Sequence, residues 1–436
     1  MADAVTKRKW LILAMLFFFM LINFADKAVL GLSAGPILHE LKLTHAQFGQ
    51  LGSSFFLLFS ASAVAVGFLI NRVSTKWTLA VMALVWALVQ LPMLFAVGLP
   101  MLIANRVILG AGEGPAFPMA LHSIYKWFPD ERRPLPTSLI ALGGAVGTGI
   151  AAPTITYVIL RYSWHAAFGL LGVLGAVWVL VWILVGREGP ILNSAAQDAP
   201  PAAPIPYGRL LTCRTILGNM LLGFSAYWML TLAVVWLPEY LRVGAGFSVA
   251  KVGWIVTLPS LCQILAVPAL SAWSERLKRR GVSSRVCRGL IGASSVGLAG
   301  ALLFLLPFTT GPVLPILCTA LAFSCGTTIF TMGAVLVAEV TPAGQRGAAL
   351  GINNAVATLA GVFAPVTMGM IVDVGATSAE GFRHGFMLVG ACVVVAAIVG
   401  GLLIDPEADT RRLSRGETKL GAGPAPATPL GKATSL

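Results

Sequence analysis

The chain has 436 residues, of which 57% are hydrophobic and only 11% are charged, while its formal net charge is +13. Soluble domains carry about 25% charged residues, so this composition excludes an ordinary soluble enzyme or binding module and indicates a multi-pass membrane protein. The basic residues lie in short loops between apolar runs. Membrane topology therefore explains the positive charge better than a nucleic-acid-binding face does.

Apolar runs long enough to cross a bilayer recur about twelve times, in two sets of six. The first set is predicted near residues 10–30, 47–70, 77–97, 100–125, 134–160 and 165–185, and the second near 214–241, 249–273, 286–306, 313–338, 347–372 and 384–404. With the N-terminus in the cytoplasm, few basic residues fall outside: Lys42, Arg161, Arg242, Lys251 and Arg383. The positive-inside rule then predicts that both termini are cytoplasmic.

A segment rich in proline and alanine separates the two sets of apolar runs. The sequence predicts a first six-helix half over residues 1–186, a cytoplasmic linker over 187–213 and a second half over 214–404. The polar tail over 405–436 is predicted to be disordered. The expected fold is an all-α membrane protein of two similar halves, and such repeats place substrate sites near the midplane between them.

Ionisable residues interrupt two of the predicted spans. Arg106 and Glu113 lie seven residues apart in ANRVILGAGEGPAFP, and Asp26 and Lys27 lie in NFADKAVL. A charge at the bilayer centre costs roughly 2.5 to 3.5 kcal/mol on insertion scales, so such residues usually serve ions or substrates. The alternative for Glu113 is a structural acid neutralised by burial or by Arg106. A mutual ion pair of Asp26 and Lys27 is the weaker account, because adjacent helical residues point about 100° apart.

No constellation typical of an enzyme or a metal site is found, and no cofactor is expected. The histidines lack ligand spacing, and the glycines of the apolar spans follow no strand, so they favour close helix packing rather than phosphate binding. The cysteines form no C-x-x-C pair and are interpreted as apolar packing residues: Cys213, Cys262, Cys287, Cys318, Cys325 and Cys392.

A basic loop follows the second span of each half, as GFLINRVSTKW from Gly67 and as SAWSERLKRR from Ser271. The first of these resembles the loop pattern G-x-x-x-D-R-x-G-R-R of the major facilitator superfamily, with Asn71 where an Asp is usual. In that superfamily the loop helps to latch one conformation. Glu275 and Arg276 keep the acid and base in the second half.

Four further motifs resemble the anion:cation symporter branch of that superfamily, which includes bacterial sugar-acid and aromatic-acid importers, sialin and the vesicular glutamate transporters. The motifs span both halves and are NFADKAVL from Asn23, GEGPAFPMALHSIYKWFPDERR from Gly112, WLPEYL from Trp236 and GINNAVATLAGVFAPVTMG from Gly351. The resemblance implies a twelve-helix transporter of a small organic anion.

By position, the resemblance implies that Asp26 and Glu113 are the protonatable carboxylates and that Arg106 is the cation that couples protonation to substrate. Lys27 stands where Arg is usual and would bind the substrate carboxylate. Lys acts as a point charge, whereas the planar guanidinium of Arg can donate two parallel hydrogen bonds to a carboxylate. Asn354 matches a polar position and is expected to line the site. The alternative for Asn354 is a hydrogen bond to a neighbouring helix.

Sugar-acid members of the branch often carry hydrogen-bonding residues at positions held here by Phe24, Phe59 and Gly144. An apolar site offers few hydrogen-bond partners to substrate hydroxyls and cannot select strongly for them, so a weakly hydroxylated monocarboxylate or aromatic acid is expected. The alternative substrates are a sugar acid (aldonate) or a dicarboxylate. Tyr227 is a candidate lining residue, although a packing or interfacial aromatic explains it equally well.

The expected function is therefore proton-coupled import of a small organic anion by a monomer in the inner membrane, with both termini cytoplasmic. A drug or metabolite exporter shares the fold, but the exporter pattern G-P-x-x-G-G is absent from LGGAVGTGIAAP. A membrane enzyme would need a catalytic group that the sequence does not offer. A sensor that transports nothing is the remaining rival class.

Overall fold

The computed structural model of the chain describes residues 2–69, 72–129, 132–191 and 205–421. Within these ranges the regular elements are helices. The first half contains the following membrane helices and one short connecting helix: α1 (Ala2–Leu32), α2 (Ala34–Glu40), α3 (His45–Leu69), α4 (Thr75–Gln90), α5 (Leu99–Glu113), α6 (Ala116–Tyr125), α7 (Pro134–Arg161) and α8 (Trp164–Val185).

The second half repeats this plan after a short helix, α9 (Tyr207–Leu211). Its helices are α10 (Arg214–Val235), α11 (Leu237–Val243), α12 (Val249–Ile255), α13 (Leu258–Arg279), α14 (Ile291–Leu305), α15 (Leu314–Cys325), α16 (Thr328–Val340), α17 (Arg346–Val374), α18 (Ser378–Leu403) and α19 (Pro406–Gly421). Single helical turns lie at Leu91–Leu94, Leu306–Phe308 and Ala343–Gln345, and a wider turn of Arg285–Leu290 leads into α14.

Eleven helical segments of the described chain are long and apolar enough to cross a membrane. The twelfth expected span is present in two shorter pieces, α5 and α6, which are separated at Gly114 and Pro115. Pro115 lies at the break, and proline lacks the backbone N–H that would continue the hydrogen-bond pattern of α5. The predicted all-α membrane fold of about twelve helices is confirmed.

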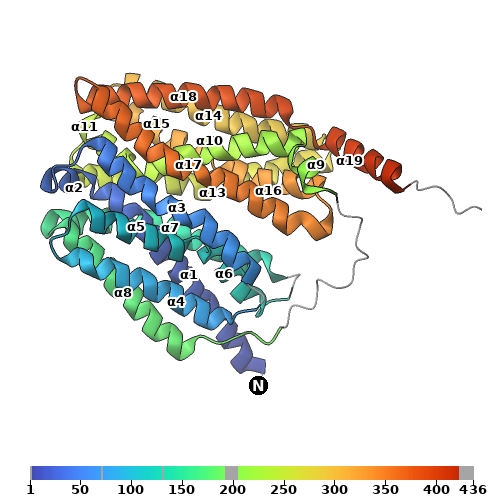
Figure 1. Cartoon of the computed structure of the whole chain (residues 1–436), viewed down its shortest axis with the longest axis horizontal. Helices are drawn as coiled ribbons and strands as arrows, with labels where there is room; N and C mark the ends of the chain where they lie inside the picture. The colour runs from blue at the N-terminus through green and yellow to red at the C-terminus, as the bar shows by residue number, and fades with distance from the viewer. Residues whose placement is uncertain (1, 70–71, 130–131, 192–204, 422–436) are drawn as a thin grey trace, which may run out of the picture.

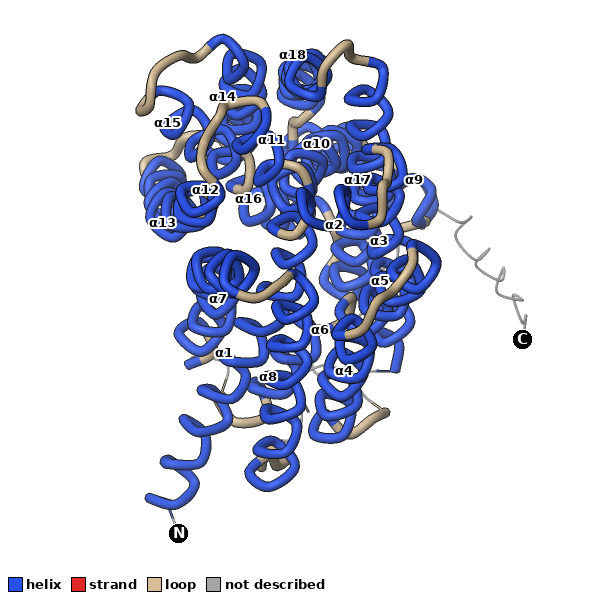
Figure 2. Tube along the Cα trace, turned by 90° about the vertical axis from the view of Figure 1, so that its left-hand side faces the viewer, coloured by secondary structure: helices blue, strands red, loops and turns tan. Residues whose placement is uncertain are grey.

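The two halves lie one above the other in Figure 1, and their helices run roughly along the long axis of the molecule. Helices α1 to α8 make up one bundle, and α10 to α18 make up the other; in the turned view the two bundles meet where α3 lies beside α17 (Figure 2). At one end of the molecule lie the short helices α2 and α11, and at the opposite end lie α9 and α19 (Figure 1).

Paired glycines allow α5 to lie directly against α3. A Cβ on Gly110 would stand 1.8 Å from the carbonyl oxygen of Phe55, and one on Gly114 would stand 2.0 Å from that of Phe59. Any side chain at these positions would force the helices apart. The close approach places Glu113, the last residue of α5, next to α3.

The two halves are pressed together at the end that carries α2 and α11. Cβ atoms built on Gly31, Gly49 and Gly369 would lie 1.9 to 2.4 Å from backbone oxygens of the opposite half. At the other end of α17, Cβ atoms on Gly347 and Gly351 would meet no atom within 4 Å. The structure is therefore closed at the α2 and α11 end, and the start of α17 faces open space.

A glutamate after the last helix of each half caps the third membrane helix of that half. Glu188 accepts hydrogen bonds from the backbone N–H of Lys76 (2.9 Å) and from Lys126 Nζ (2.8 Å). Glu407 accepts equivalent bonds from the backbone of Ser284 (2.5 Å) and Arg285 (3.3 Å). Partial burial raises the pKa of the Glu188 carboxyl, but the donated hydrogen bonds outweigh burial and lower it to about 2. The recurrence supports a parallel repeat.

The tail differs from the disorder predicted from residue 405, because it begins with the helix α19. Two interactions explain this order. Asp409 accepts a hydrogen bond of 2.7 Å from the backbone N–H of Thr215, and Leu413 is buried in a small apolar cluster with Leu210 and Val340. The composition of the tail did not predict either interaction, since most residues of the tail are polar or small. Residues 422–436, and Asn71 of the first basic loop, lie outside the described residues.

Candidate functional site

Lys27 and Glu113 form an ion pair inside the first half. Lys27 Nζ lies 2.6 Å from Glu113 Oε2 and donates a second hydrogen bond of 2.5 Å to Asn23 Oδ1. The Lys27 side chain is 14% exposed, whereas that of Glu113 is fully buried. Asn23 stands one helical turn before Lys27 on α1, so both side chains share a face of that helix. The ammonium thus has one acidic acceptor, on Glu113, and two neutral acceptors, the side-chain and backbone oxygens of Asn23.

Three phenylalanine rings surround the Lys27 ammonium. Nζ lies 4.9 Å from the centre of the Phe24 ring, 5.8 Å from that of Phe55 and 5.7 Å from that of Phe59. Cations are attracted to aromatic faces within about 6 Å, so the rings stabilise the charge without competing for its hydrogen bonds. The site thereby holds a cation in surroundings that are poor in hydrogen-bonding groups.

Asp26 and Arg106 occupy a second, fully buried cluster. Asp26 Oδ1 accepts a hydrogen bond of 2.9 Å from Gln90 Nε2, and Arg106 Nη1 donates to the Asp26 carbonyl oxygen at 3.3 Å. The guanidinium also lies 5.1 Å from the centre of the Phe168 ring. Asp26 and Arg106 are each 1% exposed. Asp26 therefore faces the packed interior of the first half, while its neighbour Lys27 faces the phenylalanine rings.

Three buried polar atoms of the Asp26 and Arg106 cluster have no hydrogen-bond partner among the described residues. They are Arg106 Nε, Arg106 Nη2 and Gln90 Oε1. Buried polar groups are nearly always paired, because an unpaired one costs about 1 to 3 kcal/mol. Such a concentration of unpaired buried polar groups is typical of a functional centre rather than of a well-packed core.

The remaining predicted residues of the first half lie close to these clusters. A Cβ on Gly144 would stand 2.7 Å from the Phe24 ring, so the space that a larger residue would occupy is filled by Phe24. Phe59 is one of the three rings around Lys27. The structure thus places Phe24, Phe59 and Gly144 at one locality with the Lys27 ammonium.

In the second half, Tyr227 continues the aromatic series. The Phe56 ring lies 5.9 Å from the rings of both Phe59 and Tyr227, and Tyr227 also packs on Phe330 at 6.1 Å. Asn354 is exposed on α17, whereas its neighbour Asn353 accepts a hydrogen bond of 2.9 Å from Asn219. The structure does not bring Asn354 into contact with the Lys27 pair.

Sequence reasoning missed three of the residues that shape the site, Gln90, Phe55 and Phe56. A glutamine inside an apolar span was a usable signal for Gln90. The two phenylalanines carry no such signal, because apolar spans are full of aromatic residues. No group of three or more His, Cys, Asp or Glu side chains within the described residues is placed to hold a metal ion.

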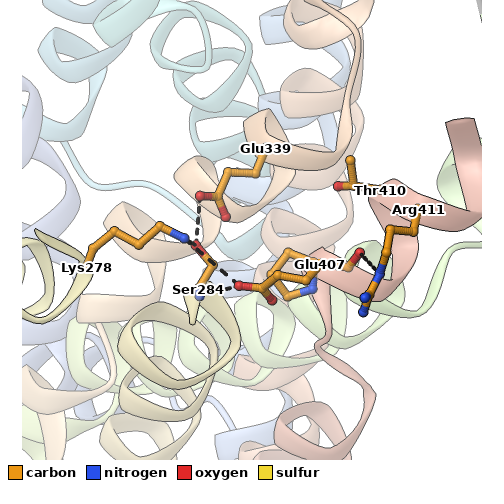
Figure 3. A pocket seen from close by; sticks show the side chains of 7 residues that line it. Lys278, Ser284, Glu339, Glu407, Thr410 and Arg411 are labelled. Carbon is orange, nitrogen blue, oxygen red and sulfur yellow. Dashed lines mark hydrogen bonds and ion pairs between the residues drawn. The ribbon is translucent and has the colours of Figure 1, made fainter. Parts of the chain in front are cut away.

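A surface pocket of about 490 Å³ lies elsewhere, at the ends of α13, α16 and α19 (Figure 3). Its polar groups bond to one another: Lys278 Nζ donates to Ser284 Oγ (2.9 Å), and Ser284 Oγ donates to Glu339 Oε1 (2.7 Å). Its other lining residues include Glu407 and Arg411. These pairings indicate a structural role for the pocket residues, at the α9 and α19 end of the second half.

Two helical halves that meet beside buried charged residues define the architecture of a secondary transporter, in which the halves rock about a central site. A family model described as "Major Facilitator Superfamily" matches residues 16–328 and residues 220–435. The chain belongs to the Major Facilitator Superfamily, and the resemblance seen in its motifs is confirmed.

Curated relatives are similar over nearly their whole length. The chain is 26% identical to a "D-galactonate transporter" of Escherichia coli, covering 91% of this chain and 96% of that protein. It is also 26% identical to a "Probable sulfoacetate transporter" of Cupriavidus necator (92% and 94% covered) and to a "Hexuronate transporter" of Bacillus subtilis (90% and 94% covered).

Solved structures agree on the fold. A bacterial homologue of the human lysosomal transporter Spinster superposes with a TM-score of 0.71 at 16% identity, covering 94% of this chain and 98% of that one. A D-xylose–proton symporter superposes with a TM-score of 0.70 at 17% identity, covering 89% and 96%. At such identities the likeness establishes the shared fold.

Proposed function

We propose that the protein is a proton-coupled secondary transporter that imports a small organic anion, with Glu113 and Asp26 as proton carriers and Lys27 as the anion-binding cation. Family membership and the names of the relatives support the class of activity. The observation that carries the coupling is the 2.6 Å contact between Lys27 and Glu113.

The contact makes Glu113 and the substrate carboxylate competitors for one ammonium. When Glu113 is ionised it occupies Lys27, and when it takes up a proton it ceases to be the counter-ion and leaves Lys27 to the anion. Binding of the anion must in turn favour protonation of Glu113 by the same factor, because coupling between two binding sites is reciprocal. Protons and anion then load together.

Charge balance also supports the loading of a proton together with the anion. Asp26, Glu113, Lys27 and Arg106 carry no net charge when all four are ionised. A monovalent anion adds one negative charge to a buried site, and one proton restores neutrality, which removes most of the cost of burying the loaded site. Arg106, with two unpartnered nitrogen groups beside Asp26, is proposed to stabilise the ionised carboxylates once the proton leaves.

The proposed substrate is a weakly hydroxylated monocarboxylate or an aromatic acid. Phe24, Phe55 and Phe59 border the ammonium, and these rings offer no partner to substrate hydroxyls. Tyr227 and Asn354 are proposed to contact the part of the substrate that faces the second half. A sugar acid is the second candidate, because two of the relatives are named for galactonate and hexuronate; the sulfoacetate relative favours the first.

The proposed orientation places both termini in the cytoplasm of a bacterial cell, with the protein a monomer in the inner membrane. In that orientation the closed end, which carries α2 and α11, faces outward, and the structure is an inward-facing state. Protons and anion would leave to the cytoplasm from this state. Import follows, because the proton gradient across a bacterial inner membrane is directed inward.

Uptake by the purified protein in proteoliposomes tests the proposal. Radiolabelled benzoate, sulfoacetate and D-galactonate are offered in turn under an inward proton gradient, an inward sodium gradient or neither. We expect accumulation of benzoate or sulfoacetate that requires the proton gradient, collapses with an uncoupler and exceeds the passive entry of the same acid into protein-free liposomes. Uptake that follows sodium alone would refute proton coupling, and preferential uptake of D-galactonate would establish the second candidate.

A further inference from the structure

The N-terminus of α3 is only partly capped by its own residues. Thr44 Oγ1 accepts a hydrogen bond of 3.2 Å from the backbone N–H of Gln47, and Gln47 Oε1 accepts one of 3.0 Å from the backbone N–H of Thr44. This is a capping box, which serves the third N–H of the helix. It leaves the N–H groups of His45 and Ala46 without a local acceptor.

Asp373, from the opposite half of the molecule, accepts both of these hydrogen bonds. The His45 N–H donates to Asp373 Oδ1 at 2.9 Å, and the Ala46 N–H donates to Asp373 Oδ2 at 2.8 Å. The His45 ring adds a third bond, from Nδ1 to Oδ1 at 2.9 Å. One carboxylate therefore completes the cap of α3 and pairs with its first side chain.

The position of Asp373 on its own helix is electrostatically unfavourable. It lies in the last turn of α17, where the helix dipole is negative and acidic residues are disfavoured. The positive N-terminus of α3 compensates for this only while the halves touch. Gly369, one turn earlier, permits that contact, because a Cβ there would stand 2.3 Å from the His45 carbonyl oxygen.

We propose that the Asp373 carboxylate is the latch of the gate at the α2 and α11 end, and that it sets how often this gate opens. Opening separates α17 from α3, breaks three bonds to one carboxylate and returns two helix N–H groups to water. The capping effect of an acidic or polar side chain corresponds to roughly a two- to thirty-fold change in an equilibrium constant. Replacing the carboxylate by an amide removes the charge and one of the two acceptor oxygens that the N–H groups of His45 and Ala46 use, and it should raise the open population by a factor in that range.

The rate at which a buried cysteine is labelled measures this population without any substrate, so its outcome is independent of the proposed transport activity. Ser53 is suitable as the labelling site because it is 7% exposed and its Oγ accepts a 3.3 Å hydrogen bond from the Val366 N–H of the opposite half. Ser53→Cys is introduced after the native cysteines have been replaced. A membrane-impermeant maleimide is then added to each face of the membrane in turn.

The test compares Asp373→Asn with Glu380→Gln in the Ser53→Cys protein. Glu380 is a matched control, since it is an exposed acid at the same end of the same half and caps no helix of the first half. We expect labelling from the α2 and α11 face to become two- to thirty-fold faster in Asp373→Asn and to stay unchanged in Glu380→Gln. Size-exclusion profiles and melting temperatures establish that both variants fold.

His45→Ala provides a second variant that leaves both backbone hydrogen bonds to Asp373 in place. We expect it to accelerate labelling less than Asp373→Asn does. If Asp373→Asn does not fold, Asp373→Glu carries the same comparison, because it keeps the charge but displaces it by one methylene. Labelling at the parental rate in a folded Asp373 variant, or equal acceleration in Glu380→Gln, would overturn the proposal.

Discussion

Replacing Glu113 by Gln should separate anion binding from proton coupling. The substitution keeps the shape of the side chain, but it turns the 2.6 Å ion pair with Lys27 into a contact with a neutral amide. A hydrogen bond to a charged group contributes about 1.5 to 3 kcal/mol, so losing this competitor should tighten anion binding by roughly 10- to 150-fold at neutral pH. Because protonation of Glu113 removes the same competitor, the parent should approach the affinity of the variant as the pH falls.

Isothermal titration with the best substrate of the proteoliposome panel measures this difference across pH 5 to 8. Glu239→Gln is a matched control, since Glu239 is also a buried acid paired with a basic residue, Arg242, at 2.5 Å. The control should lower stability and leave affinity unchanged. In proteoliposomes, Glu113→Gln should exchange substrate across the membrane but should not accumulate it.

Two results would refute this reasoning. Accumulation by Glu113→Gln at the parental level would make Glu113 a structural acid. An unchanged affinity with the same pH dependence as the parent would show that the substrate does not compete with Glu113 for Lys27.

Further substitutions test the neighbouring parts of the account. Lys27→Ala should abolish binding of the anion in the same titration, whereas Lys27→Arg should retain binding with altered selectivity, since Arg adds a bidentate fork at equal charge; normal affinity in the Ala variant would move the anion site elsewhere. Phe24→Tyr should improve competition by D-galactonate over benzoate by up to about tenfold, because one added hydrogen bond contributes about 0.5 to 1.5 kcal/mol; no change would separate Phe24 from the substrate. Glu188→Gln should destabilise the folded protein by about 1 kcal/mol at neutral pH, after allowance for solvent screening of a side chain that is 39% exposed. The pKa of Glu188 is lowered to about 2, so the loss of stability, measured as a lower melting temperature than that of the parent, should persist above pH 4.3 and vanish as the pH falls toward 2. A difference in melting temperature that is constant with pH would contradict the role of the ionised Glu188 carboxylate.

The sequence predicted the membrane fold well because apolar length is a strong and local signal. It also singled out Asp26, Lys27, Arg106 and Glu113, since charges in apolar spans are conspicuous. Their partners were harder to foresee. Arg106 and Glu113 lie seven residues apart, about 10.5 Å along one helix, so each must find partners on other helices. Which helix supplies them depends on tertiary packing.

The glycine contacts show what that packing decides. Gly110 and Gly114 bring α5 against α3, and this approach places Glu113 near Lys27 of α1 and the rings of Phe55 and Phe59. At Gly144, the ring of Phe24 from α1 fills the space beside the backbone of α7. Single-residue patterns select candidate residues, whereas the surroundings of each one emerge from contacts between helices far apart in sequence.

The central claim is that protons and anion cross the membrane together, and a pH-sensitive dye sealed inside proteoliposomes tests it most directly. With the membrane potential clamped and no pH gradient imposed, adding the substrate outside should acidify the lumen, with a rate that saturates with substrate concentration. The Glu113→Gln protein, reconstituted to the same density, should give no acidification while still exchanging labelled substrate. Entry of substrate into vesicles of the parental protein without any acidification of the lumen would contradict the account.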